Sequence, residues 1–259
     1  MRTVTAIRYV TPLREGGSLP AIVEADDSGL YVVKFRGAGH GARALVAECV
    51  TGELARAAGL RVPELVRVQV GEPLGRNEPD PEIRDLLRAS VGLNLGLDYL
   101  PGSITFDPVA GPGPAAAEAS DIVWFDSFTS NVDRTARNPN LLCWHGRLWL
   151  IDHGAALYFH HNWDDELARS QSPFAAVKAH VLLPWANDVP GAGQRLEPRL
   201  GSEVFARVLA EVPDEWLGDE PRVATCADHR AAYVRHLERR LAAAPAFVEE
   251  AERARAAVV

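Results

Sequence analysis

Short apolar runs separated by turn residues dominate the first 36 positions of the chain. Residues 4–11, 20–25 and 30–36 are rich in Val, Ile, Tyr and Phe, the residue types that favour β-strands. Gly16-Gly17-Ser18 lies between the first two runs, and Asp26-Asp27-Ser28-Gly29 lies between the second and the third. Because glycine and aspartate clusters favour tight turns, this pattern predicts a three-stranded antiparallel meander.

A helical pattern follows the meander. Apolar residues recur at helical spacing between Ala42 and Ala58, and Gly59 comes where a helix would end. Residues 60–70 lead into a fourth predicted strand, and residues 90–100 form a fifth. The intervening residues 71–85 are polar and contain three prolines, which predicts a surface excursion.

A stretch rich in proline and glycine at residues 107–118 separates the strand-rich first part of the chain from a second part with mainly helical patterns. A helix is predicted from Glu118 to Ser130, and a hairpin with strands at 140–144 and 147–151 around a His145-Gly146 turn. Further helical periodicity occupies residues 173–183, 201–211, 224–243 and 245–257. The predicted fold is therefore α+β and bilobal. Residues 1–106 form a small antiparallel β-sheet lobe with one helix, and residues 107–259 form a larger, mainly helical lobe.

Composition and charge narrow the classes of function. The 259 residues include 47% hydrophobic and 24% charged residues, which is typical of a soluble globular protein. A net charge of -8 argues against a nucleic-acid surface, since binding to phosphates requires clustered Lys and Arg. No apolar run reaches the roughly 18 residues that span a bilayer, and no metal-ligand spacing links the three cysteines. We expect buried, reduced thiols, a cytoplasmic location and no membrane contact.

The candidate chemistry lies at the two ends of the predicted hairpin. Asp133 and Asn138 precede its first strand, and Asp152 follows its second. Two carboxylates and an amide in this order are typical of phosphoryl transfer, in which oxygen ligands hold a metal and a carboxylate orients the acceptor hydroxyl. Upstream, Lys34 interrupts an apolar strand, so its side chain either points to solvent or reaches into a cleft. Glu48, in the following helix, is either its partner or part of a solvated face.

These residues resemble the motifs of the HipA-like kinases. The match comprises Asn131-x-Asp133, then Asn138 and Asp152, with Val-Val-Lys34 upstream. Gly-Leu-x-Val-Pro at residues 59–63 also resembles HipA-like and aminoglycoside-kinase-like chains. The resemblance implies a bilobal protein-kinase-like fold that binds ATP and Mg²⁺. It departs from the family at Arg134-Thr135, where the family's loop histidine is missing, and we expect a compact, stand-alone member without the additional N-terminal subdomain.

The resemblance also implies a role for each matching residue. Lys34 would bind the ATP phosphates and be oriented by Glu48; Asp133 would accept or orient the acceptor proton, while Asn138 and Asp152 would bind Mg²⁺. Asn140 remains an alternative amide ligand, and Arg134 or Arg137 would offset charge on the transferred phosphoryl group. Asn131 would brace the loop. The remaining cofactor-binding candidates are Gly17 and Ser18 at the glycine turn, for phosphate, and Asp98, Tyr99 and Leu100 at the end of the fifth strand, for adenine.

We therefore predict an ATP- and Mg²⁺-dependent kinase that transfers the γ-phosphate to a hydroxyl acceptor, with a protein Ser or Thr as the first choice. A small-molecule phosphotransferase on the same fold and a nucleotide-binding pseudokinase acting as an interaction module are the alternatives. The sequence names neither the acceptor nor the oligomeric state. It also leaves open whether Ser170 or Ser172, in the segment that follows Asp152, is a site of regulatory phosphorylation.

Overall fold

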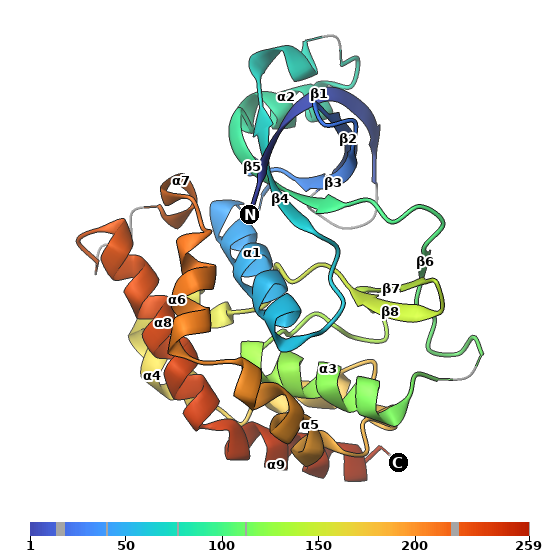
Figure 1. Cartoon of the computed structure of the whole chain (residues 1–259), viewed down its shortest axis with the longest axis vertical. Helices are drawn as coiled ribbons and strands as arrows, with labels where there is room; N and C mark the ends of the chain where they lie inside the picture. The colour runs from blue at the N-terminus through green and yellow to red at the C-terminus, as the bar shows by residue number, and fades with distance from the viewer. Residues whose placement is uncertain (14–18, 40, 77, 112, 219–222, 259) are drawn as a thin grey trace.

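The fold is mixed α+β, with the long strands in the first 100 residues and most of the helices after residue 115 (Figure 1). Within the part of the chain that the structure describes, the buried hydrophobic residues form two clusters. The smaller one fills the strand-rich part, and the larger one lies among the helices. The computed structural model describes residues 1–13, 19–39, 41–76, 78–111, 113–218 and 223–258.

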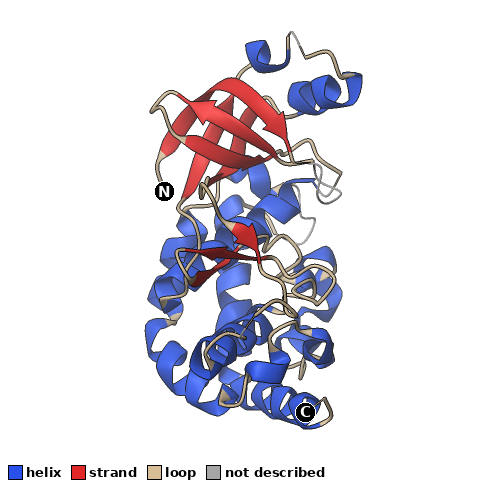
Figure 2. Cartoon of the chain, turned by 90° about the vertical axis from the view of Figure 1, so that its right-hand side faces the viewer, coloured by secondary structure: helices blue, strands red, loops and turns tan. Residues whose placement is uncertain are grey.

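The five long strands, red in Figure 2, form a closed barrel, whereas the sequence predicted a small antiparallel sheet without specifying its closure. Neighbouring strands are antiparallel except at the closure, where residues 3–5 pair in parallel with residues 67–69. At Gly96, a Cβ atom would come within 2.6 Å of Val68 Cγ2, so the absent side chain lets two strands approach closely. The strands, in barrel order, are β1 (Thr3–Pro12), β2 (Ala21–Ala25), β3 (Leu30–Lys34), β5 (Gly92–Asp98) and β4 (Leu65–Val70).

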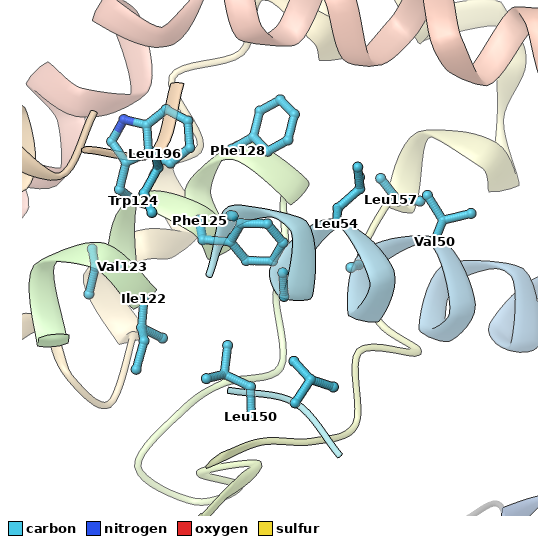
Figure 3. Packing of buried hydrophobic residues seen from close by; sticks show 14 of the residues in the cluster. Val50, Leu54, Ile122, Val123, Trp124, Phe125, Phe128, Leu150, Leu157 and Leu196 are labelled. Carbon is cyan, nitrogen blue, oxygen red and sulfur yellow. The ribbon is translucent and has the colours of Figure 1, made fainter. Parts of the chain in front are cut away.

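Helix α1 (Gly41–Ala58) connects the barrel to the larger core. Its apolar face contributes Val50 and Leu54 to the cluster that also contains Phe125 and Phe128 of α3 (Figure 3). Gly59 ends the helix with φ +90°, and the amide of Leu60 donates to the carbonyl of Ala55. The predicted C-terminal glycine is confirmed, because only a residue that tolerates positive φ allows this termination.

The predicted surface excursion at residues 71–85 is wrong in part, because this region contains a helix. A 3₁₀ turn, η1 (Glu72–Gly75), precedes α2 (Pro81–Ala89). The side chain of Asp80 accepts a hydrogen bond from the amide of Glu82, and Pro81 occupies the first turn. Asp followed by Pro is a helix-start signal, which the three prolines obscured.

The predicted hairpin forms with nearly the predicted bounds. Strands β7 (Leu141–Trp144) and β8 (Arg147–Leu150) pair around His145 and Gly146, which have φ +48° and +70°. Positive φ at both central residues is the geometry that suits a two-residue hairpin. Strand β6 (Ile104–Thr105) adds a third strand, and the indole Nε1 of Trp144 donates to the carbonyl of Pro101 at 2.9 Å. The hairpin is thereby tied to the segment that leaves the barrel.

The remaining helices pack against α1 and against one another and enclose the larger hydrophobic cluster. Helix α3 begins two residues before the predicted Glu118, and the helix predicted at residues 173–183 is wrong. That stretch instead forms the 3₁₀ turns η4 (Ala175–Ala179) and η5 (Leu183–Trp185), since Phe174 has φ +60° and Pro184 interrupts regular hydrogen bonding. The α-helices of this part are α3 (Ala116–Thr129), α4 (Glu166–Ser170), α5 (Val189–Leu196), α6 (Ser202–Ala210), α7 (Asp214–Leu217), α8 (Cys226–Ala242) and α9 (Ala244–Ala256).

Candidate active site

Lys34, Glu48 and Asp152 meet although they come from three distant parts of the chain. The ammonium Nζ of Lys34 donates to Glu48 Oε2 at 2.7 Å and to Asp152 Oδ1 at 2.5 Å. Strand β3 ends at Lys34, the middle of α1 supplies Glu48, and Asp152 follows β8 with φ +54°. The pairing of Lys34 with Glu48 that the sequence predicted is present, and the lysine faces inward rather than toward solvent.

The opposite charges of Lys34 and of the two carboxylates, Glu48 and Asp152, stabilise one another. The side chain of Glu48 is fully buried, whereas 46% of the Asp152 side chain is exposed. Burial alone would raise the pKa of Glu48, but the charge of Lys34 and the nearby ring of His153 lower it to about 2. Burial opposes the charge of Lys34 as well, yet the two carboxylates raise its pKa above the ordinary value. An ammonium therefore lies beside a half-exposed carboxylate at neutral pH.

The loop before the hairpin places three polar side chains around Asp133. Asn138 Nδ2 donates to Asp133 Oδ2 at 2.7 Å, and Asn140 Nδ2 approaches the same oxygen at 3.3 Å. Asn131 accepts from the amide of Asp133 and donates to the buried Asp126, so it braces the loop as the sequence predicted. Both amides next to Asp133 point their nitrogen atoms at it, so their oxygen atoms point elsewhere.

Two cavities meet at Lys34, Asn138 and Asp152. The smaller cavity has a volume of about 610 Å³ and also contains Asp133 in its wall. The rest of its wall comes from the segment between β3 and α1, from the start of α1 and from the segment after Asp152. These parts include Phe35, Ala38, Arg43, Ala44, Gly154, Ala155, Tyr158 and His161.

The larger cavity, of about 740 Å³, lies between the barrel and the β7–β8 hairpin. Asp98, Tyr99 and Leu100 line it, as do Asn140 and the apolar side chains of Val32, Leu97, Leu142 and Ile151. The amides of Asp98 and Tyr99 donate to the carbonyls of Glu64 and Leu30. Within the described residues, no hydrogen bond engages the amide of Leu100, which leaves this donor for a ligand in the larger cavity.

The oxygen atoms at the junction suit a hard divalent cation. Asp152 supplies a half-exposed carboxylate, and Asn138 and Asn140 supply amide oxygens that accept no hydrogen bond from any described residue. In the described part of the chain, no three His, Cys, Asp or Glu side chains form a metal cluster. A site with one carboxylate and an amide fits Mg²⁺, which is usually bound by few protein ligands together with water and substrate phosphates. The choice between Asn138 and Asn140 stays open, because both line the larger cavity with Asp152.

Several sequence predictions do not correspond to this geometry. Arg134 was one of two arginines predicted to offset charge on the transferred phosphoryl group, and this alternative is wrong, because the side chain of Arg134 is fully buried against Asp126. Arg137 is exposed on the loop and lines neither of the two cavities. Gly17 and Ser18 lie outside the described residues. Of the three free cysteines, Cys49 is buried as predicted, whereas Cys143 and Cys226 are partly exposed.

Sequence reasoning missed two buried polar residues that support the site. They are His180 and Asp126, and His180 Nε2 lies 2.9 Å from Asp126 Oδ2. These residues are 54 positions apart, and no spacing rule connects them. One signal was present, since an aspartate within the apolar run of residues 122–128 requires a buried partner.

The overall fold resembles that of solved kinases. The Helicobacter pylori proinflammatory kinase CtkA matches with a TM-score of 0.61 and 13% identity, covering 99% of this chain and 98% of that chain. The Golgi casein kinase, solved with manganese and ADP bound, matches with a TM-score of 0.53 and 13% identity, over 96% of this chain and 74% of that chain. At such identities the likeness establishes the fold alone, which is that of kinases.

The chain belongs to the HipA-like kinase family, whose model matches residues 6–250. Family and fold together support a phosphotransferase. No curated protein matches the sequence. Among the described residues, no helix is both long and apolar enough to cross a bilayer.

Proposed function

We propose that the protein is an ATP- and Mg²⁺-dependent kinase that transfers the γ-phosphate to a hydroxyl acceptor, with a protein Ser or Thr as the first choice. One observation carries the proposal: Lys34 and Asp152 lie in contact at the junction of two cavities, with Asn138 beside them. Residues 1–106 would act as the nucleotide-binding lobe, and residues 107–259 as the lobe that carries the catalytic loop.

The larger cavity is assigned to the nucleotide. Its apolar walls suit a purine ring, and the amide of Leu100, together with the backbone of Asp98 and Tyr99, would bind the edge of the adenine. Lys34, held by Glu48, would contact the phosphates at the inner end. Mg²⁺ bound by Asp152 and an amide of Asn138 or Asn140 would neutralise phosphate charge there.

The smaller cavity is assigned to the acceptor, because Asp133 lines it. Asp133 would accept or orient the proton of the attacking hydroxyl, while Asn138 and Asn140 fix the position of its carboxylate. Transfer would occur at the junction, where Asp133 is next to the metal-binding oxygens. Positioning and charge neutralisation are the main contributions that a protein makes to phosphoryl transfer.

The test compares the wild type with Asp152→Ala in two assays, thermal shift and transfer of labelled γ-phosphate, each with ATP and Mg²⁺. Asp85→Ala is a matched control, because Asp85 is an exposed aspartate on α2 with a side chain 72% accessible. Wild type and Asp85→Ala should be stabilised by nucleotide, and Asp152→Ala should lose both the stabilisation and the transfer.

A wild type that does not respond to ATP and Mg²⁺ would refute the proposed function. Stabilisation of Asp152→Ala equal to that of the wild type would refute the assigned site. Stabilisation of the wild type without transfer to any protein or small hydroxyl compound would favour the pseudokinase alternative.

A further inference from the structure

Arg134 follows the proposed catalytic Asp133 but points the other way, into the protein. Its side chain is fully buried, and its guanidinium contacts three separate parts of the site. Nε donates to Asp126 Oδ2 on α3, and Nη1 donates to the carbonyl of Asn140, with the carbonyl of Ile151 3.3 Å away. One side chain thus connects the catalytic loop with the residue before β7 and the residue after β8.

The two carbonyls belong to peptide groups that adjoin the proposed metal ligands Asn140 and Asp152. Asn140 and Asp152 both have positive φ, +48° and +54°, which is uncommon for residues other than glycine. The carbonyl of Ile151 belongs to the peptide group that precedes the α-carbon of Asp152. The carbonyl of Asn140 belongs to the peptide group that follows the α-carbon of Asn140. Strained conformations of this kind persist only where surrounding contacts enforce them. The guanidinium group of Arg134 supplies such contacts next to Asn140 and Asp152.

Asp126 is in turn held from three directions. His180 Nδ1 accepts from the amide of Leu182 at 3.1 Å, so the hydrogen on Nε2 is donated to Asp126 Oδ2. Asn131 Nδ2 donates to Asp126 Oδ1 at 3.1 Å. Burial alone would raise the pKa of Asp126, but the charge of Arg134 and the hydrogen bond from His180 hold it well below its usual range. The carboxylate therefore provides a fixed anchor for the arginine.

We infer that Arg134, anchored by Asp126 and His180, is a positioning residue that sets Asp152 and Asn140 in the geometry for binding the metal ion. This inference rests on the proposed nucleotide and metal site. It assigns Arg134 no contact with substrate. It also explains why an arginine rather than a lysine is suited to position 134, because only a planar fork reaches a carboxylate and two carbonyls together.

The experiment measures how nucleotide binding depends on Mg²⁺ in folded wild type, Arg134→Lys and Arg240→Lys. Arg240 is the matched control, being another buried arginine that donates to backbone carbonyls, those of Ser127 and Phe128 among them, away from both cavities. Circular dichroism and thermal melting establish folding, and titrations with ATP are repeated over a range of Mg²⁺ concentrations.

In Arg134→Lys, the Mg²⁺ concentration for half-maximal effect should rise by about 10- to 100-fold, the usual result of removing a partner of a metal ligand. Binding of ATP without metal should stay at the wild-type level, and Arg240→Lys should keep the wild-type dependence on Mg²⁺. Hydrogen exchange of the Ile151 amide, which donates to the Asn140 carbonyl at 3.1 Å, should accelerate in Arg134→Lys but not in Arg240→Lys. The exchange measurement requires no ligand.

The inference would be overturned if the Mg²⁺ concentration for half-maximal effect in Arg134→Lys equalled that of the wild type, or if it rose equally in Arg240→Lys. Either result would leave the proposed function intact. The absence of Mg²⁺-dependent ATP binding in the wild type would instead overturn the proposed function. If Arg134→Lys does not fold, His180→Leu replaces it, because it removes one of the donors to Asp126. In His180→Leu, the Mg²⁺ concentration for half-maximal effect should rise measurably, by less than 10-fold. An unchanged concentration would overturn the inference.

Discussion

Replacing Glu48 by Gln should reveal how strongly the buried charge pair stabilises the fold. The carboxyl pKa falls from 4.5 to about 2 in the folded protein, and each unit corresponds to about 1.4 kcal/mol. Glu48 should therefore contribute about 3 kcal/mol to the free energy of unfolding at pH 7, since its side chain is fully buried and unscreened by solvent. Glutamine keeps the size of the side chain, removes its charge and replaces one acceptor oxygen by an NH2 donor.

The dependence on pH has a definite sign. Glu48 ionises at a lower pH in the folded than in the unfolded protein, so its contribution is complete above the unfolded pKa of 4.5 and is lost as the pH falls toward 2. Urea denaturation should show that the difference in free energy of unfolding between wild type and Glu48→Gln is smaller at pH 3 than at pH 7, by about 2 kcal/mol.

Glu53→Gln is the matched control, because it makes the same change five residues along the same helix. Burial raises the pKa of Glu53, so ionisation disfavours the folded state there and the substitution should not destabilise the protein at pH 7. A cost of less than about 1 kcal/mol for Glu48→Gln at pH 7, or a difference from the wild type in unfolding free energy that does not change with pH, would contradict this role of Glu48.

Three further outcomes are expected. Asp133→Asn should keep Mg²⁺-ATP affinity while lowering kcat by about 100-fold or more, measured by steady-state phosphate transfer; unchanged kcat would remove Asp133 from the proposed mechanism. Leu54→Ala, at a fully buried position of α1, should destabilise by about 2–5 kcal/mol in urea, whereas Leu167→Ala, 57% exposed, should stay near the wild type. Asp80→Ala should destabilise by about 1 kcal/mol through loss of the α2 cap, and a result no larger than that of the exposed Asp85→Ala would contradict the capping role.

Local patterns predicted the elements that carry the candidate site. The glycine at position 59, the two-residue turn at His145-Gly146 and the apolar strand before Asp152 are signals contained within a few residues, and the structure has each of them. The pairing of Lys34 with Glu48 depended instead on the resemblance to known kinases. The roles of these residues in catalysis stay predictions.

What could not be predicted depends on contacts between distant residues. Closure of the barrel requires β1 to pair with β4, which is more than 60 residues away in the chain, and no periodicity encodes that register. Arg134 looked like a site residue because it adjoins Asp133, yet the strand-like alternation of side chains in an extended loop can turn neighbours in opposite directions. Its true partner, Asp126, is on the helix before the loop.

The parallel closure of the barrel has a practical consequence for producing the protein. Residues 3–5 join the ring of strands to β4, so a purification tag placed directly before them would crowd the seam where the first strand meets its neighbour. The end of α9 lies at the opposite end of the molecule from the barrel (Figure 1). A tag attached there should leave strand pairing undisturbed and give the higher yield of folded protein.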